Sequence, residues 1–167
     1  SGETPVYYSG PFWDNEEVES AIQCLLTGKW LSAGSSVYKF EKSFSKKFNH
    51  AESVMVNSGS SANLIMLAAL KKVYGWNDGD EIILSVVGFP TTLAPIIQNG
   101  LTPVFIDIEM DTLNFDLNEV VKKISKKTKA IFISPVLGNP PDMDELVNIS
   151  KKYGVELILD GCDSLGS

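Results

Sequence analysis

From residue 51 onward, short runs of apolar and β-branched residues alternate with segments in which apolar residues recur every three or four positions. Short apolar runs bounded by turn residues are typical of buried strands, and the longer spacing is typical of helices. The expected strands are 53–56, 81–86, 103–107, 130–134 and 156–160. The expected helices between them are about 60–73, 90–99, 116–124 and 142–153. This alternation predicts an α/β fold with a mainly parallel sheet flanked by helices.

The first fifty residues follow a different pattern, which predicts two amphipathic helices. Residues 14–27 begin with Asp14 and Glu17 at the spacing of a capping box, and their apolar positions share one face. The second helix is marked by apolar residues at spacings of three and four: Val37, Phe40, Phe44 and Phe48. We therefore expect an N-terminal arm with helices in residues 1–50 and a larger domain in residues 51–167.

Composition and charge narrow the class of protein. The 167 residues are 44% hydrophobic and 21% charged, which is ordinary for a globular protein with a buried core. The formal net charge of −7 argues against a nucleic acid or an anionic membrane as partner, because both attract clustered Lys and Arg. Two cysteines, Cys24 and Cys162, indicate no disulfide framework and fit a reducing compartment. With no signal peptide and no apolar run of membrane-spanning length, a cytoplasmic location is expected.

In a parallel sheet of this kind, ligands bind at the carboxyl ends of the strands. Residues 57–63 (Asn-Ser-Gly-Ser-Ser-Ala-Asn) follow the first expected strand and open a helix. Gly59 allows close approach of a ligand, Ser60 and Ser61 add hydroxyl donors, and the free amides of a helix start favour an anion. The alternative is an ordinary serine N-cap. A serine-hydrolase triad is not expected, because the only histidine, His50, precedes the strand and no Gly-x-Ser-x-Gly motif is present.

Three further candidates follow other strands. Asp160 closes an apolar strand, where a carboxylate is costly to bury unless it is paired, and a positively charged ring nitrogen would pair it. The alternative is a cap for a following helix. Phe89, held by Pro90, could stack on a flat cofactor or belong to the core. Asn139 could reach a cofactor or substrate, although Gly-Asn-Pro is also common turn chemistry. A phosphate and a cationic ring nitrogen are both features of pyridoxal phosphate.

Together these segments resemble the DegT/DnrJ/StrS sugar aminotransferase and dehydratase family of fold-type-I pyridoxal-phosphate enzymes. The segments that carry the resemblance are 28–34 (GKWLSAG), 37–41 (VYKFE), 57–63 (NSGSSAN), 100–107 (GLTPVFID) and 141–145 (PDMDE). Three others resemble the branch of CDP-4-keto-6-deoxyglucose 3-dehydratases of lipopolysaccharide sugar synthesis: 88–92 (GFPTT), 137–140 (LGNP) and 160–167 (DGCDSLGS). Pro135 and Gly161 depart from that pattern, since relatives often have histidine and asparagine there.

The resemblance implies a cofactor and a role for each candidate. Pyridoxal 5'-phosphate or pyridoxamine 5'-phosphate would be bound by these residues: Gly59, Ser60 and Ser61 at the phosphate, Phe89 on the ring, Asp160 at the ring nitrogen and Asp163 near the 3-hydroxyl. Asn139 would contact the substrate, a nucleotide-linked keto-sugar. The resemblance further implies a homodimer, in which residues 30–34 border the neighbouring active site. A dehydratase would also work with an iron–sulfur reductase.

The reaction depends on a residue that the resemblance places beyond residue 167. A lysine there forms a Schiff base and implies an aminotransferase that uses glutamate, whereas a histidine acts only as acid or base and implies a dehydratase. On this basis the chain is expected to be the N-terminal part of an incomplete large domain, inactive alone, with residues 53–56 lacking their usual neighbours. No residue of the chain is assigned as catalytic, and the 3-dehydratase is favoured.

Two other classes stay open. One is a non-catalytic module: a decayed remnant, a sensor that binds a sugar nucleotide or the cofactor, or a chain that is completed by another polypeptide. The other is an unrelated nucleotide-binding domain, against which the lack of Gly-x-Gly-x-x-Gly after the first expected strand counts.

Overall fold

The computed structural model describes residues 2–5, 10, 12–28 and 32–167. The chain forms two compact units, Ser1–Met55 and Val56–Ser167. The first unit contains two helices, α1 (Asn15–Thr27) and α2 (Ser35–Phe48). The elements of the second are α3 (Gly59–Tyr74), β1 (Glu81–Ser85), α4 (Pro90–Gln98), β2 (Thr102–Ile106), α5 (Leu117–Lys123), β3 (Thr128–Ile133), the 3₁₀ turn η1 (Val136–Gly138), α6 (Met143–Tyr153) and β4 (Glu156–Leu159). Of the segment 30–34, residues 30 and 31 lie outside the described residues.

The strands of the second unit form one parallel sheet in the order β2-β1-β3-β4. Strand β1 pairs with β2 through Ile83 opposite Val104, and with β3 through Ile83 opposite Ile131. The chain therefore passes outward from β1 to β2, then back across β1 to β3 and on to β4. The predicted parallel sheet and its flanking helices are confirmed within one or two residues at each end.

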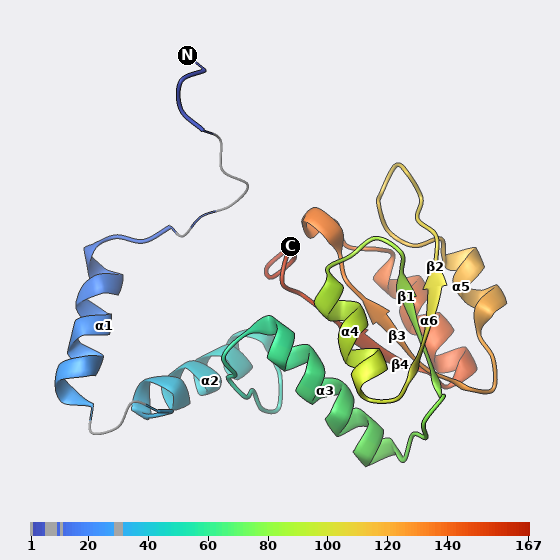
Figure 1. Cartoon of the computed structure of the whole chain (residues 1–167), viewed down its shortest axis with the longest axis horizontal. Helices are drawn as coiled ribbons and strands as arrows, with labels where there is room; N and C mark the ends of the chain where they lie inside the picture. The colour runs from blue at the N-terminus through green and yellow to red at the C-terminus, as the bar shows by residue number, and fades with distance from the viewer. Residues whose placement is uncertain (1, 6–9, 11, 29–31) are drawn as a thin grey trace. The chain divides into compact units, whose positions relative to one another are not determined.

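Helices cover both faces of the sheet, because alternate residues of each strand point to opposite sides. Helices α3 and α4 lie on one face and α5 and α6 on the other (Figure 1). Ile82 and Leu84 pack with α3 and α4, whereas Ile83 packs with α5 and α6. The same alternation divides β3, where Ala130 and Phe132 belong to the first layer. Both layers are fully buried near the middle of the sheet, which explains why residues 82–84 of β1 and 130–133 of β3 are all apolar.

Acidic caps begin several helices, as their spacing predicts. Asp14 and Glu17 form a complete capping box at α1, with the Asp14 backbone N–H donating to Glu17 Oε2 at 2.8 Å. Asp116 caps α5, and Asp142 caps α6 by accepting from the Glu145 backbone N–H at 3.0 Å. These caps satisfy amide groups that have no partner within the helix.

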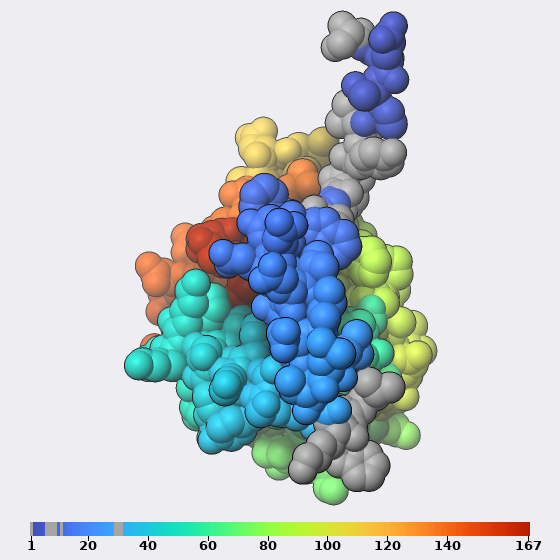
Figure 2. Space-filling view, turned by 90° about the vertical axis from the view of Figure 1, so that its left-hand side faces the viewer, coloured from blue at the N-terminus to red at the C-terminus, as the bar shows by residue number. Residues whose placement is uncertain are grey.

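The first unit buries few of its apolar side chains. Phe44 lies between Phe40 and Phe48 on α2, with ring centroids 5.8 and 4.6 Å away, so the predicted second helix forms and these apolar residues share one face. Helix α1 (blue in Figure 2) has no buried residue among those described. Its apolar positions, including Leu25 and Leu26, are exposed. No helix in the described ranges is both long and apolar enough to cross a membrane.

The expected strand at residues 53–56 is not formed. In the described part of the chain it pairs with none of the four strands of the sheet. An extended segment becomes a strand only when a neighbour takes its N–H and C=O groups, so β-branched residues alone are insufficient. Val54 is 81% exposed, as expected for an apolar residue without a covering layer.

Shortening a buried side chain of strand β3 should destabilise the protein. Ile131→Ala is expected to lower the free energy of unfolding by about 2–5 kcal/mol, because the fully buried side chain leaves a cavity between β3 and the α5–α6 layer. Urea denaturation followed by circular dichroism measures this loss. The control is Ile97→Ala on α4, where 59% of the residue is exposed and the change should stay within about 1 kcal/mol. Equal losses in both variants would contradict this assignment of the core.

Candidate functional site

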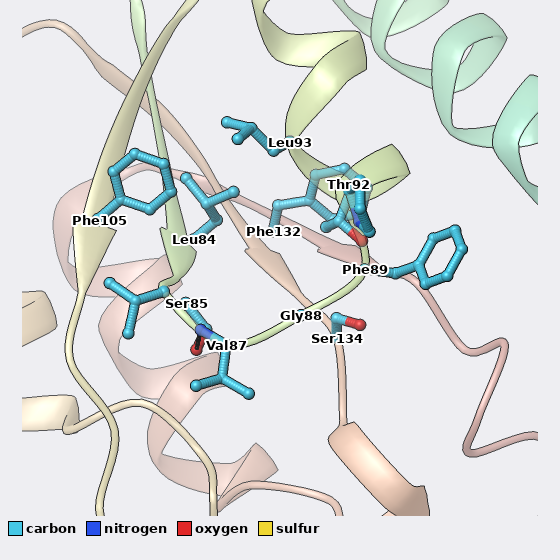
Figure 3. Close-up of a pocket in the computed structure, with 12 residues that line it drawn as sticks. Leu84, Ser85, Val87, Gly88, Phe89, Thr92, Leu93, Phe105, Phe132 and Ser134 are labelled. Atoms are coloured by element: carbon cyan, nitrogen blue, oxygen red, sulfur yellow. Dashed lines mark hydrogen bonds between the residues drawn. The ribbon is translucent and has the colours of Figure 1, made fainter. Parts of the chain in front are cut away.

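The topology creates a switch point between β1 and β3, because the chain leaves these neighbouring strands toward opposite edges of the sheet. Ligands of open α/β sheets bind at the carboxyl ends of the strands beside such a point. A pocket of about 250 Å³ lies there (Figure 3). It is lined by Leu84, Ser85, Val86, Val87, Gly88, Phe89, Pro90, Thr92, Leu93, Phe105, Phe132 and Ser134. The lining is mainly apolar, with hydroxyl groups from three side chains.

The start of α3 presents free donor groups. Ser58 caps the helix by accepting from the Ser61 backbone N–H at 3.2 Å, and the Ala62 N–H donates to the Ser58 carbonyl at 3.0 Å. The backbone N–H groups of Gly59 and Ser60 have no acceptor in the described part of the chain. A Cβ built on Gly59 would meet no atom within 4 Å, so the space beside it is open. The segment is thus both a serine cap and a helix start with amides available to an anion.

Asp160 is joined to this helix. Its Oδ2 accepts a hydrogen bond from Asn63 Nδ2 of α3 at 2.8 Å and another from Thr92 Oγ1 of α4 at 2.9 Å. The Asp160 backbone N–H donates to the Ile133 carbonyl at 2.8 Å, which holds it at the end of the sheet. The structure therefore places the acid within one side-chain length of the helix that carries Ser60 and Ser61.

The alternative interpretation of Asp160, as the cap of a following helix, has limited support. Its Oδ1 accepts from the Cys162 backbone N–H at 3.3 Å, but the residues after it form a turn rather than a helix in the described chain. The carboxylate is therefore held mainly by α3 and α4.

Phe89 is not a core residue. It occupies the N-cap position of α4, directly before Pro90, and it is 67% exposed. Its ring points away from Phe105 and Leu84, at the opposite end of the group of lining residues (Figure 3). A flat ligand could therefore reach this ring without displacing the core.

Asn139 and Asp163 lie on adjoining turns beyond the ends of β3 and β4. The Asn139 amide donates to the Thr112 carbonyl at 2.8 Å, so in this structure it fastens the loop after β2. Asp163 has an exposed side chain, and its carbonyl lies 2.9 Å from where a Cβ on Gly138 would stand. Gly138 has φ of +78°, so both the backbone conformation and this close approach require glycine there.

The sequence interpretation gave no role to Asn63 or Thr92, although both hold Asp160. Asn63 is 6% exposed and Thr92 is 4% exposed. A signal was present, since each lies four residues before a fully buried apolar residue of its helix, Leu67 and Ile96 respectively. A polar side chain on the buried face of a helix needs a hydrogen-bond partner, which this spacing could have indicated.

The fold and this site define a class of protein. The chain matches the DegT/DnrJ/EryC1/StrS aminotransferase family over residues 12–167, and it belongs to that family.

Several curated relatives are named as enzymes of nucleotide-linked sugars. The chain is 37% identical, over its whole length, to 37% of a dTDP-4-dehydro-2,6-dideoxy-D-glucose 3-dehydratase from Saccharopolyspora spinosa. It is 41% identical, over 93% of its length, to 40% of a GDP-4-keto-6-deoxy-D-mannose 3-dehydratase from Yersinia pseudotuberculosis. It is also 37% identical, over its whole length, to 39% of the lipopolysaccharide biosynthesis protein RfbH of Salmonella typhimurium. The chain thus spans about two fifths of the length of these relatives, and the predicted resemblance to 3-dehydratases is confirmed.

Solved structures agree with the fold. A GDP-4-keto-6-deoxymannose-3-dehydratase with a trapped PLP–glutamate geminal diamine superposes with a TM-score of 0.90 at 38% identity, covering 98% of this chain and 42% of that one. The NtdA protein of Bacillus subtilis with bound PMP superposes with a TM-score of 0.82 at 30% identity, covering 92% of this chain and 35% of that one. The predicted fold class, that of the large domain of fold-type-I pyridoxal-phosphate enzymes, is confirmed.

Removal of the Asp160 carboxylate should destabilise the second unit. Asp160→Ala leaves the buried Asn63 amide and Thr92 hydroxyl without their acceptor, which costs about 1–3 kcal/mol for each unsatisfied group. The free energy of unfolding, measured in urea, should therefore fall by at least about 1 kcal/mol. The matched control Asp163→Ala removes an exposed carboxylate and should change it by less than about 0.5 kcal/mol. A loss of the same size in both variants would show that the Asp160 contacts contribute nothing.

Proposed function

We propose that residues 56–167 bind pyridoxal 5'-phosphate or pyridoxamine 5'-phosphate as part of a 3-dehydratase that acts on a nucleotide-linked 4-keto-6-deoxy sugar. The observation that carries the proposal is the Asp160 carboxylate, which is hydrogen-bonded to the helix whose first residues can bind a phosphate. Family membership and the 3-dehydratase relatives support the reaction class.

The phosphate would be held at the start of α3. The Gly59 and Ser60 amides point out of the first helical turn, and the positive end of the helix dipole favours an anion. The Ser60 and Ser61 hydroxyls add donors, and the open space beside Gly59 admits the phosphate oxygens. Lysine side chains are not required for this site, because backbone amides supply the neutralising dipoles.

The ring nitrogen would be held by Asp160. A half-buried carboxylate at the end of β4 stabilises a proton on a nearby nitrogen, since the resulting ion pair satisfies both charges. When bound, the cofactor supplies an electron sink for charge that develops on the substrate. The role of the chain is to keep this proton in place and to orient the ring.

Three other residues complete the proposed site. Phe89 offers an exposed ring to one face of the cofactor, and Asp163 would lie near its 3-hydroxyl. Asn139 would contact the sugar after its amide leaves the Thr112 carbonyl. These three roles rest on the family resemblance together with their positions beyond the strand ends.

An aminotransferase is the second candidate, because the family bears that description. The dehydratase is favoured, since the relatives above at 37% and 41% identity are 3-dehydratases and Asp163 is an acid, as in the dehydratase pattern. A homodimer and an iron–sulfur reductase partner are part of the proposal for the whole enzyme. The activity itself belongs to a polypeptide with the length of the relatives.

The proposed phosphate site at the start of α3 is tested by comparing the affinities for pyridoxal phosphate and for pyridoxal. In the full polypeptide that contains residues 1–167, Ser60→Ala should weaken binding of pyridoxal phosphate about tenfold, because a hydrogen bond to a charged group is lost. Binding of pyridoxal, which lacks the phosphate, should be unchanged. Ser36→Ala, at the corresponding second position of α2, is the matched control. If Ser60→Ala weakens both ligands alike, the serine does not contact the phosphate.

The reaction class is tested with GDP-4-keto-6-deoxy-D-mannose and glutamate, with and without an iron–sulfur reductase and its electron donor, followed by mass spectrometry and NMR of the sugar. A dehydratase removes the C3 oxygen and leaves a carbonyl at C4, whereas an aminotransferase leaves an amine at C4. We expect the first product, and Asp160→Ala should lower its rate by about a hundredfold or more, since removing one partner of a desolvated charge pair costs about 3–5 kcal/mol. An amine at C4 would favour the aminotransferase. If the sugar stays unchanged with the GDP-linked substrate and also with its CDP- and dTDP-linked counterparts, both the dehydratase and the aminotransferase are excluded.

A further inference from the structure

The two oxygens of the Asp160 carboxylate have different surroundings. Oδ2 accepts from two side chains on two different helices, Asn63 at 2.8 Å and Thr92 at 2.9 Å. Oδ1 has only the contact with the Cys162 backbone N–H at 3.3 Å in the described chain. One oxygen is therefore occupied by the protein, and the other keeps capacity for a further donor.

The two donors are themselves fixed in orientation. The Asn63 amide nitrogen also donates to the Thr91 carbonyl at 3.1 Å, so both of its hydrogens are used and the amide cannot rotate freely. Thr92 is almost fully buried in the first turn of α4, which begins at Pro90. The carboxylate is thus clamped from two sides by groups that are held by their own helices.

We propose that Asn63 and Thr92 are positioning residues, which occupy Oδ2 of Asp160 so that Oδ1 is presented to the ring nitrogen of the cofactor. This inference rests on the proposed function. Neither residue touches the reacting atoms in this arrangement, and both act through Asp160.

If the hydrogen bonds of Asn63 and Thr92 only held α3, α4 and β4 together, the expected effect on ligand binding would differ. Loss of such a purely structural contact would lower the affinity of every ligand of the site equally, because the helices would shift together. Loss of a positioning contact weakens only ligands that bind the Asp160 Oδ1 atom. The ring nitrogen is therefore the feature to vary.

The experiment compares pyridoxal phosphate with its 1-deaza analogue, in which carbon replaces the ring nitrogen, on the full polypeptide that contains residues 1–167. The unsubstituted protein should bind pyridoxal phosphate more tightly than the analogue. Thr92→Val and Asn63→Leu should each weaken pyridoxal phosphate about tenfold and leave the analogue nearly unchanged, since each removes a hydrogen bond to a charged group. Thr92→Ser, which keeps the hydroxyl, should restore binding, and Thr91→Val is the matched control next to it.

A second readout follows the proton directly. With ¹⁵N-labelled cofactor, the ring nitrogen of the unsubstituted protein should give the chemical shift of a protonated pyridine across neutral pH. In Thr92→Val and Asn63→Leu it should lose this proton at lower pH, whereas in Thr91→Val it should not.

The outcomes separate the inference from the function on which it rests. If the unsubstituted protein prefers the nitrogen-containing cofactor and the variants keep the full preference, or lose both ligands equally, the positioning role is wrong and the cofactor site stands. If the unsubstituted protein binds neither ligand, or binds both alike, the proposed site at Asp160 fails first. Selective loss in the two variants with rescue by Thr92→Ser supports the positioning role.

Discussion

The site depends on one carboxylate, Asp160, that accepts hydrogen bonds from two helices at once. Asn63 on α3 and Thr92 on α4 approach the same oxygen, and the Asp160 backbone continues the hydrogen bonding of β3. The two hydrogen bonds to Oδ2 offset the cost of removing this half-buried carboxylate from water. The contacts therefore fix the positions of the α3 start, the α4 start and the end of β4 relative to one another.

The sheet provides the place for this arrangement through its strand order. Because β1 and β3 are neighbours whose connections leave in opposite directions, the loops after them diverge and leave space at their carboxyl ends. The pocket lined by Gly88 and Ser134 is a consequence of that divergence. Thr92 lines the pocket and also donates to Asp160, so the apolar pocket and the polar contacts of Asp160 adjoin.

Hydrogen-bond pairing between strands is the constraint that decides residues 53–56. They have the composition of a strand, and the sequence interpretation treated them as a strand that lacks its usual neighbours; none of the four described strands pairs with them. The four strands that do form have neighbours supplied by their own βαβ connections. Local preference predicted an extended segment, but whether it becomes a strand depends on residues distant in the sequence.

Residue patterns by themselves determined the helices, the four paired strands and the position of the polar segments after them. These follow from local physics: apolar periodicity, acidic caps such as Asp14 and Asp142, and turn-forming glycines. Family membership could also be predicted from the sequence, because it rests on short motifs in a fixed order. Only the tertiary structure decided that Asn63 and Thr92 meet on one oxygen of Asp160, and that Asn139 turns toward Thr112. Which buried polar groups become partners depends on how two helices pack on the sheet, and no local pattern contains that geometry.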